Sequence, residues 1–254
     1  MQAISHFLSV TQNANRPILT HYHSFRDEIS GPVAARWVAK MANLLASDLS
    51  PDLFGGDENT PHILINLPAG WQSTFWQVSA NFMGWETRTD TISQDSPSIA
   101  FSFDVHVSDE LVPLEASTAA WRLAHSITPL AMRWRGPLPA GILDALAELM
   151  AQSDQFEYEA LESAPALDNY IAQVDAEEDA LFKAASALGM PTRLGLYTKN
   201  FPSAPLLTRL WLAGHSVVVV DKSHYDAQKA QEIFASEKVQ LAVDEELKAP
   251  HSRG

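Results

Sequence analysis

Apolar residues follow two alternating patterns along this chain. Short, nearly unbroken apolar runs, such as those at 62–67 and 216–220, are typical of buried parallel strands. Other stretches place apolar residues three or four positions apart, as amphipathic helices do. The clearest stripe of this second kind is Trp71, Phe75, Val78 and Phe82. Because the two patterns alternate from 16 to 243, the sequence predicts an α/β fold.

The same patterns predict individual elements. We expect a hairpin strand at 17–25 with a turn at 26–28, a helix capped by Ser30, a strand at 62–67, a helix at 71–82, strands at 85–88 and 98–105, a helix turn beginning at 108–110, a helix at 142–151, a helix at 167–188 that is interrupted near Asp175, a strand at 192–197, a helix at 204–213, a strand at 216–220, a helix capped by Asp226 and a strand at 239–243. The segment 116–135 has helix-like spacing but contains Pro129.

Short connections between strands and helices are typical of right-handed crossovers. We therefore expect a three-layer α/β fold with a mostly parallel sheet flanked by helices. It would form a single domain at 1–243, with two lobes at approximately 1–110 and 138–243 joined by an irregular segment. The charged end, 244–254, is expected to be a flexible tail.

Composition narrows the classes of function. The 254 residues carry a formal net charge of −14, which opposes binding to nucleic acid. The chain has no cysteine, which excludes disulfides and thiol catalysis and suits the cytoplasm. No segment approaches the roughly 20 apolar residues that a membrane helix needs, and the N-terminus has no basic region typical of a signal peptide. We expect a cytoplasmic protein without a membrane partner.

Glycine-rich phosphate loops are missing from the sequence. Neither G-x-G-x-x-G nor G-x-x-x-x-G-K-[S/T] occurs, and these are the spacings that let backbone N–H groups surround phosphate. The residue patterns alone therefore predict an α/β domain without a specified chemistry.

Several groups of residues invite a functional interpretation beside a structural one. His21 and His23 would share one strand face, as a metal-binding pair does, but no third ligand is evident, and surface histidines are the favoured interpretation. Gly214, His215 and Ser216 resemble a nucleophile elbow but follow a helix rather than precede one, which favours a helix stop and a buried strand.

Three larger groups are interpreted in the same way. Four acidic residues could bind a cation, but a solvated helix face is the favoured interpretation: Asp175, Glu177, Glu178 and Asp179. Five aromatic residues could line an acyl pocket, but packing in the core is the favoured interpretation: Trp71, Phe75, Trp76, Phe82 and Trp85. The arginines beside Trp121 and Trp134 could bind a phosphate or a carboxylate, but a position on the solvated surface is the favoured interpretation: Arg122, Arg133 and Arg135.

Four segments, taken in order, resemble the N-terminal half of the large domain of AMP-forming acyl-CoA synthetases, which belong to the adenylate-forming superfamily. They are 16–22 with 37–45, 62–71, 82–86, and 193–201 with 212–221. The likeness is greatest to short, stand-alone homologues that retain this half alone. It implies the fold of that N-terminal domain and a ligand-binding region at Phe201, Tyr197 and Gly214. By this resemblance Phe201 falls near the position at which the family has an acyl-binding residue.

The sequence departs from this family where phosphate is bound. The resemblance places a Ser/Thr/Gly-rich loop ending in lysine between about 161 and 188, and here that span is acidic, which would repel triphosphate. The family's adenine-binding segment, ribose-binding aspartate and C-terminal domain with its catalytic lysine also find no counterpart. We therefore expect a truncated homologue, a pseudoenzyme with no catalytic residue, no metal and no cofactor, that acts as a ligand-binding or interaction protein.

The alternative is an AMP-forming acid–thiol ligase-like enzyme with residual nucleotide or acyl binding that needs a partner chain. ATP, AMP or CoA would be bound only if the family activity persists. In either case an acyl or nucleotide compound is the expected small molecule. A homo-oligomer or a partner protein is expected to cover the apolar surface that truncation exposes.

Overall fold

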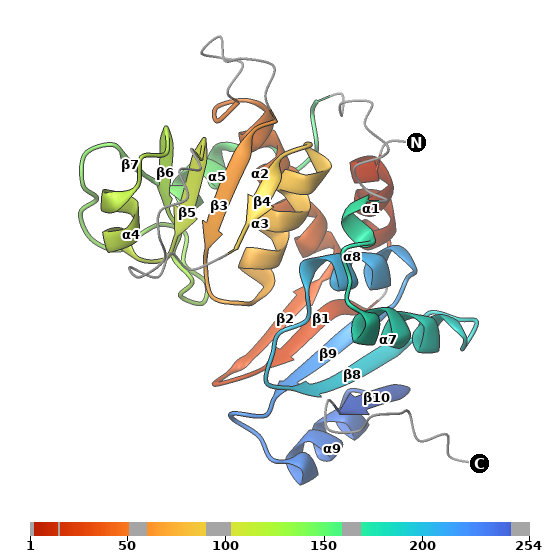
Figure 1. Cartoon of the computed structure of the whole chain (residues 1–254). Helices are drawn as coiled ribbons and strands as arrows, with labels where there is room; N and C mark the ends of the chain where they lie inside the picture. Colours follow the sequence, from red (N-terminus) through yellow and green to blue (C-terminus); the bar gives the residue numbers. More distant parts are fainter. Residues whose placement is uncertain (1–2, 15, 51–59, 90–102, 159–168, 245–254) are drawn as a thin grey trace. The chain divides into compact units, whose positions relative to one another are not determined.

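The computed structural model describes residues 3–14, 16–50, 60–89, 103–158 and 169–244 (Figure 1). The chain forms two compact units, of which the first comprises Met1–Ser5 and Arg36–Asp168 and the second comprises His6–Ala35 and Asn169–Gly254. These units differ from the lobes expected at 1–110 and 138–243, because the N-terminal hairpin joins the last third of the chain. The expected flexible tail lies outside the described residues, apart from Asp244.

The helices and strands occur in the following order: α1 (Ala3–Gln12), β1 (Pro17–Tyr22), β2 (Arg26–Ser30), α2 (Gly31–Ala46), β3 (His62–Asn66), α3 (Trp71–Phe82), β4 (Glu86–Arg88), β5 (Val105–Ser108), α4 (Leu111–Ala116), β6 (Trp121–Ala124), β7 (Ile142–Asp144), α5 (Ala145–Ala151), α7 (Ala176–Ser186), β8 (Arg193–Thr198), α8 (Ala204–Leu212), β9 (Ser216–Asp221), α9 (Ala227–Ser236) and β10 (Leu241–Asp244). None of the helices in the described part of the chain has both the length and the apolar character needed to cross a bilayer.

The first unit contains a sheet with strand order β4-β3-β5-β6-β7, and all its pairings are parallel. From β3 to β4 and from β5 to β6 the chain moves in opposite directions across the sheet. Right-handed crossovers therefore place α3 and α4 on opposite faces. The stripe on α3 is buried at Phe75, Val78 and Phe82, as its spacing predicts.

The second unit contains a sheet with strand order β10-β8-β9-β1-β2, in which only the edge pair β1–β2 is antiparallel. The central strand β9 is buried on both faces at Val217–Val220. Val218 and Val220 pack against α9, and α8 lies on the opposite side of the sheet (Figure 1). The expected fold class is thus confirmed: helices flank mostly parallel sheets, although these are two five-stranded sheets rather than one.

Two segments form strands where the sequence pattern suggested otherwise. Trp121–Ala124 is the parallel strand β6 inside a stretch with helix-like spacing. Ile142–Asp144 is the strand β7, so the helix predicted from 142 begins only at Ala145. Asp144 explains that later start, because its carboxylate accepts hydrogen bonds from the N–H groups of Leu146 and Ala147 as an N-cap.

Other boundaries also move. The turn predicted at 26–28 is part of β2, and α1 was not predicted at all. Of the strand predicted at 98–105, residues 98–102 lie outside the described part, and the observed strand β5 is Val105–Ser108. The interruption predicted near Asp175 is the start of α7, where the Asp175 carboxylate accepts from the N–H groups of Glu177 and Glu178.

Candidate ligand-binding edge

The carboxyl ends of β1, β8 and β9 meet at one edge of the sheet in the second unit. These strands are mutually parallel and end at Tyr22, Thr198 and Asp221. In open parallel sheets ligands bind outside this edge, where loops replace the paired backbone. We call this region the carboxyl edge.

Four rings form a continuous column at the carboxyl edge. The His21 and His23 rings are stacked with their centroids 4.4 Å apart and an interplanar angle of 24°. The Phe201 ring lies 4.9 Å from His21 at one end, and the Phe25 ring lies 4.1 Å from His23 at the other. Phe25 is exposed, so the column opens to solvent at that end.

Strand geometry explains how the column is built. His21 and His23 are two residues apart and therefore point to the same side of the chain, as the sequence predicts. His21 pairs with Val219 of β9 and so faces away from α9, which covers Val218 and Val220. Phe201 follows β8, two strands away, and its packing on His21 closes the column.

The inner histidine of the column is uncharged at neutral pH. Burial, helped by the neighbouring His23, lowers the pKa of His21 to about 4. His23 instead lies 3.3 Å from the carboxylate of Asp27, and His224 lies 3.1 Å from Asp221. Burial opposes ionisation of Asp221, but hydrogen bonds from Ser223 and His224 outweigh it, so its pKa lies below its ordinary value.

This arrangement favours an organic ligand over a metal ion. Flat ring faces and a neutral imidazole, which donates from one nitrogen and accepts at the other, suit a planar or acyl group with a polar atom. Within the described ranges no group of three or more histidines and carboxylates is placed to hold a metal ion. The metal interpretation of His21 and His23 therefore gains no third ligand there.

The three residues expected to bind ligand are not all brought together. Phe201 belongs to the ring column. Tyr197 also lies near the carboxyl edge but packs under α9 on the other face, where its hydroxyl donates to the carbonyl of Tyr225 at 2.9 Å. Gly214 ends α8 with φ +80° and precedes β9, so it lies at the opposite edge of the sheet.

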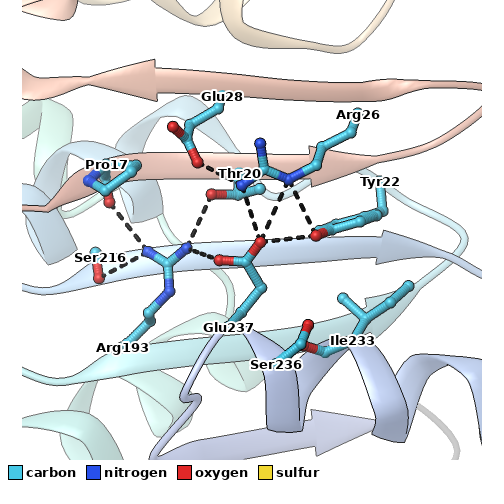
Figure 2. Close-up of polar contacts among 10 residues, drawn as sticks. All are labelled: Pro17, Thr20, Tyr22, Arg26, Glu28, Arg193, Ser216, Ile233, Ser236 and Glu237. Atoms are coloured by element: carbon cyan, nitrogen blue, oxygen red, sulfur yellow. Dashed lines mark hydrogen bonds and ion pairs between the residues drawn. The ribbon is translucent and has the colours of Figure 1, made fainter.

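A polar network centred on the buried Arg193 lies on the α9 face of the same sheet and was not predicted (Figure 2). Arg193 donates to the Pro17 carbonyl at 3.1 Å, to Thr20 Oγ1 at 2.9 Å and to Glu237 Oε2 at 2.6 Å. Glu237 also accepts from Tyr22 at 2.7 Å and from Arg26 at 3.0 Å. Arg26 also pairs with Glu28, so the network contains two guanidinium groups and two carboxylates. It joins β1, β2 and β8 to the end of α9, and its charges balance, so it holds the sheet together rather than offering a site.

The nucleophile-elbow interpretation receives no support from the local geometry. His215 is buried, and its Nδ1 accepts a hydrogen bond from the backbone N–H of Thr192 at 3.0 Å. Ser216 Oγ instead lies 3.4 Å from the Arg193 guanidinium. The pair therefore has the structural roles that the favoured interpretation assigns to it.

The acidic run has structural partners within the second unit. Asp175 caps α7, Glu178 accepts from the Ser203 N–H at 3.0 Å and from its hydroxyl at 2.7 Å, and Asp179 pairs with Arg209 at 2.7 Å. Only Glu177 fits the solvated-face interpretation fully.

The aromatic and arginine groups lie in the first unit. Phe75, Trp76, Phe82 and Trp85 are buried in its core, and Trp71 is half-buried against Trp37 and Phe75. Arg122 lies in β6, whereas Arg133 and Arg135 are exposed in the loop that follows it.

No protein-family model and no curated protein matches this sequence. Solved structures do match its fold. An acyl-CoA synthetase from Brucella canis aligns with TM-score 0.57 and 14% identity, over 96% of this chain and 47% of that chain. The amide bond synthetase McbA from Marinactinospora thermotolerans aligns with TM-score 0.56 and 14% identity, over 94% and 48%. The N-terminal subdomain of Klebsiella oxytoca NpsA, in complex with 3-hydroxyanthranilyl-AMSN, aligns with TM-score 0.54 and 11% identity, over 95% and 59%.

These matches establish the fold. The chain has the α/β architecture of the N-terminal region of adenylate-forming enzymes, as the sequence resemblance implied. It spans about half the length of the solved structures that it matches.

Proposed function

We propose that this protein binds a small acyl or aromatic compound at the carboxyl edge of its second unit and does not adenylate it. The ring column supplies the exposed apolar ring of Phe25 and the neutral imidazole of His21 at the edge where open parallel sheets bind ligands. An enzyme with the same fold, NpsA, is described in complex with 3-hydroxyanthranilyl-AMSN, which contains an aromatic acyl group. That likeness in fold supports the ligand class for this chain.

The observation that carries the proposed lack of adenylation is the capped start of α7, inside the span where the family resemblance places the phosphate loop. A free helix N-terminus attracts phosphate through its unpaired N–H groups. Here the carboxylate of Asp175 already accepts from the N–H groups of Glu177 and Glu178, at 2.9 and 2.8 Å. A phosphate at this helix would have to displace one negative charge and approach the carboxylates of Glu177 and Glu178 in the first turn, where the third acidic residue, Asp179, is paired with Arg209.

Thermal stabilisation of the purified protein tests this proposal. A ligand at a hundred times its Kd raises the free energy of unfolding by about 2.7 kcal/mol. We expect stabilisation by members of a panel of aryl acids, fatty acids and acyl-CoAs, none by ATP–Mg²⁺, and no release of AMP or pyrophosphate when ATP, CoA and carboxylates are supplied together. ATP-dependent stabilisation or turnover would instead favour the acid–thiol ligase-like enzyme, and no stabilisation by any compound would favour a pure interaction role.

Matched variants locate the ligand on the column. Phe201→Leu removes one ring while keeping an apolar side chain, and it should weaken the stabilisation. Tyr197→Phe changes a residue near the end of β8, the strand that precedes Phe201, on the other face of the sheet, and it should leave the stabilisation unchanged. Equal effects of the two substitutions would place the ligand elsewhere.

A further inference from the structure

The first unit displays an apolar, basic loop between β6 and β7. We call residues 126–136 the tip loop. Its apolar side chains are exposed at Ile127, Leu130 and Met132, and Leu130 is 98% exposed. Arg133 and Arg135 follow on the same loop, and within the described ranges neither guanidinium pairs with a carboxylate.

Leu130 occupies a backbone position that suits glycine. The N–H of Ala131 donates to the carbonyl of Thr128 at 3.1 Å, which closes a turn with Pro129 and Leu130 at its centre. Leu130 has φ +57°, and a positive φ at the third residue of such a turn is normally adopted by glycine or asparagine. The backbone of a leucine at this φ is strained, and the exposed side chain makes almost no contacts within the chain that would offset the strain.

The base of the tip loop is fixed. The N–H of Trp134 donates to Asp144 Oδ2 at 2.8 Å. The Trp134 side chain packs against the cluster formed by Leu114, Ala124 and Ile142. Leu130 is therefore exposed on a loop whose base is already ordered, which lowers the conformational entropy lost when a partner binds.

The charge around the tip loop is opposite to that of the rest of the chain. Residues 116–143 contain Arg122, Arg133 and Arg135 and no aspartate or glutamate. All 31 acidic residues and 14 of the 17 lysines and arginines therefore lie outside this stretch. An anionic lipid surface would attract the loop but repel the acidic remainder, whereas the acidic surface of a second copy complements the loop.

We propose that the tip loop is a docking surface for a second copy of this chain, with Leu130 and Met132 covered and Arg133 and Arg135 facing acidic residues of the partner. Two-fold symmetry allows each copy to offer its loop to an acidic surface of the other. This use of the loop is independent of the ligand proposed for the second unit.

Sedimentation velocity on the full chain, from about 1 to 100 μM, tests the proposal. The wild-type protein should dimerise at 50 mM NaCl and dissociate at 500 mM, because the charges that attract the copies are screened. The double variant Arg133→Glu, Arg135→Glu should remain monomeric at low salt. A wild-type protein that is monomeric throughout would overturn the proposal.

Single variants separate docking from folding. Leu130→Gly should weaken dimerisation about a hundredfold, because the symmetric dimer loses two buried leucine side chains and each contributes about tenfold. At 500 mM NaCl, where both proteins should be monomeric, it should not lower the melting temperature, because glycine suits the positive φ. Met132→Ala should weaken dimerisation, and Met190→Ala in the second unit should not, although the two methionines are 61% and 59% exposed. Equal effects of the two methionine variants would contradict the proposal.

Vesicle binding provides the remaining comparison. Vesicles of phosphatidylcholine and phosphatidylserine in a 4:1 ratio should not sediment the protein. Sedimentation that Leu130→Gly abolishes would assign the loop to a lipid surface and overturn docking between copies.

Discussion

The guanidinium of Arg193 lies 2.6 Å from the carboxylate of Glu237, although the first residue begins β8 and the second follows α9. Their side chains are 4% and 14% exposed. The pair joins the face of the second sheet to the end of the helix that covers it, and it is held by further bonds to β1 and β2 (Figure 2). The carboxyl edge is carried by the same strands, so this pair stabilises the framework of the proposed ligand site.

Loss of the Glu237 charge should destabilise the second unit strongly. Glu237→Gln leaves the Arg193 guanidinium buried without its counter-ion, and breaking a buried pair in this way costs about 3 kcal/mol. Urea unfolding followed by circular dichroism measures this loss. The control is Glu232→Gln, which breaks the exposed 2.8 Å pair with Lys229 and should leave the free energy of unfolding unchanged within error. A stable Glu237→Gln variant would show that the network is dispensable.

Acidification should destabilise the first unit well before its carboxylates are protonated. His106 is fully buried, neither of its ring nitrogens has a partner in the described part of the chain, and burial lowers its pKa to about 4. The unfolded chain binds a proton near pH 6.5 and the folded one only near 4. The free energy of unfolding is therefore highest above pH 6.5 and falls as the pH decreases from 6.5 towards 4. The loss is about 2 kcal/mol at pH 5.

The variant His106→Leu isolates this effect. Leucine fills the buried position without ring nitrogens, so the variant should lose less stability than wild type between pH 7 and pH 5. Urea unfolding at the two pH values checks this expectation. An unchanged pH dependence would mean that His106 does not titrate as its burial requires.

The cap of α7 is expected to contribute measurable stability. Asp175→Ala removes the acceptor for two backbone N–H groups and should cost about 1 kcal/mol, whereas Asp175→Asn retains an acceptor and should cost less. Chemical denaturation of the three proteins distinguishes these values. Identical stabilities would remove the argument that the helix N-terminus is occupied.

Close packing of α9 on β8 depends on a glycine. A Cβ atom added at Gly195 would lie 2.8 Å from the Phe234 ring and 2.9 Å from Val239. Gly195→Ala should therefore cost about 1–3 kcal/mol through overpacking. At Gly70 the nearest atom to an added Cβ is 3.7 Å away, so Gly70→Ala is the matched control and should be tolerated. Thermal melts of both variants decide the comparison, and an undisturbed Gly195→Ala protein would show that α9 moves aside at little cost.

The last third of the fold follows from local sequence signals. The β-branched run at Val217–Val220, the stop at Gly214 and the cap at Asp226 each determine one boundary with residues a few positions apart. By contrast, β6 consists of only Trp121–Ala124 and owes its conformation to pairing with β5. The placement of the N-terminal hairpin beside β9 is likewise set by a pairing about 200 residues distant, which no local pattern encodes.

The candidate site was predictable only in part. The two-residue spacing of His21 and His23 correctly predicts a shared face, and the resemblance drew attention to Phe201. Their contact spans 180 residues and arises from the strand order, so it could not be derived from spacing. Arg193 gave no signal either, because a single arginine at the start of a strand is not distinctive until Glu237 is placed beside it.

Titration calorimetry of the purified chain with ATP–Mg²⁺ tests the central claim most directly. Because Asp175 occupies the first N–H groups of α7 and the surrounding turn is acidic, we predict no saturable heat of binding up to about 1 mM nucleotide. Saturable binding of ATP–Mg²⁺ with a micromolar Kd would contradict the account.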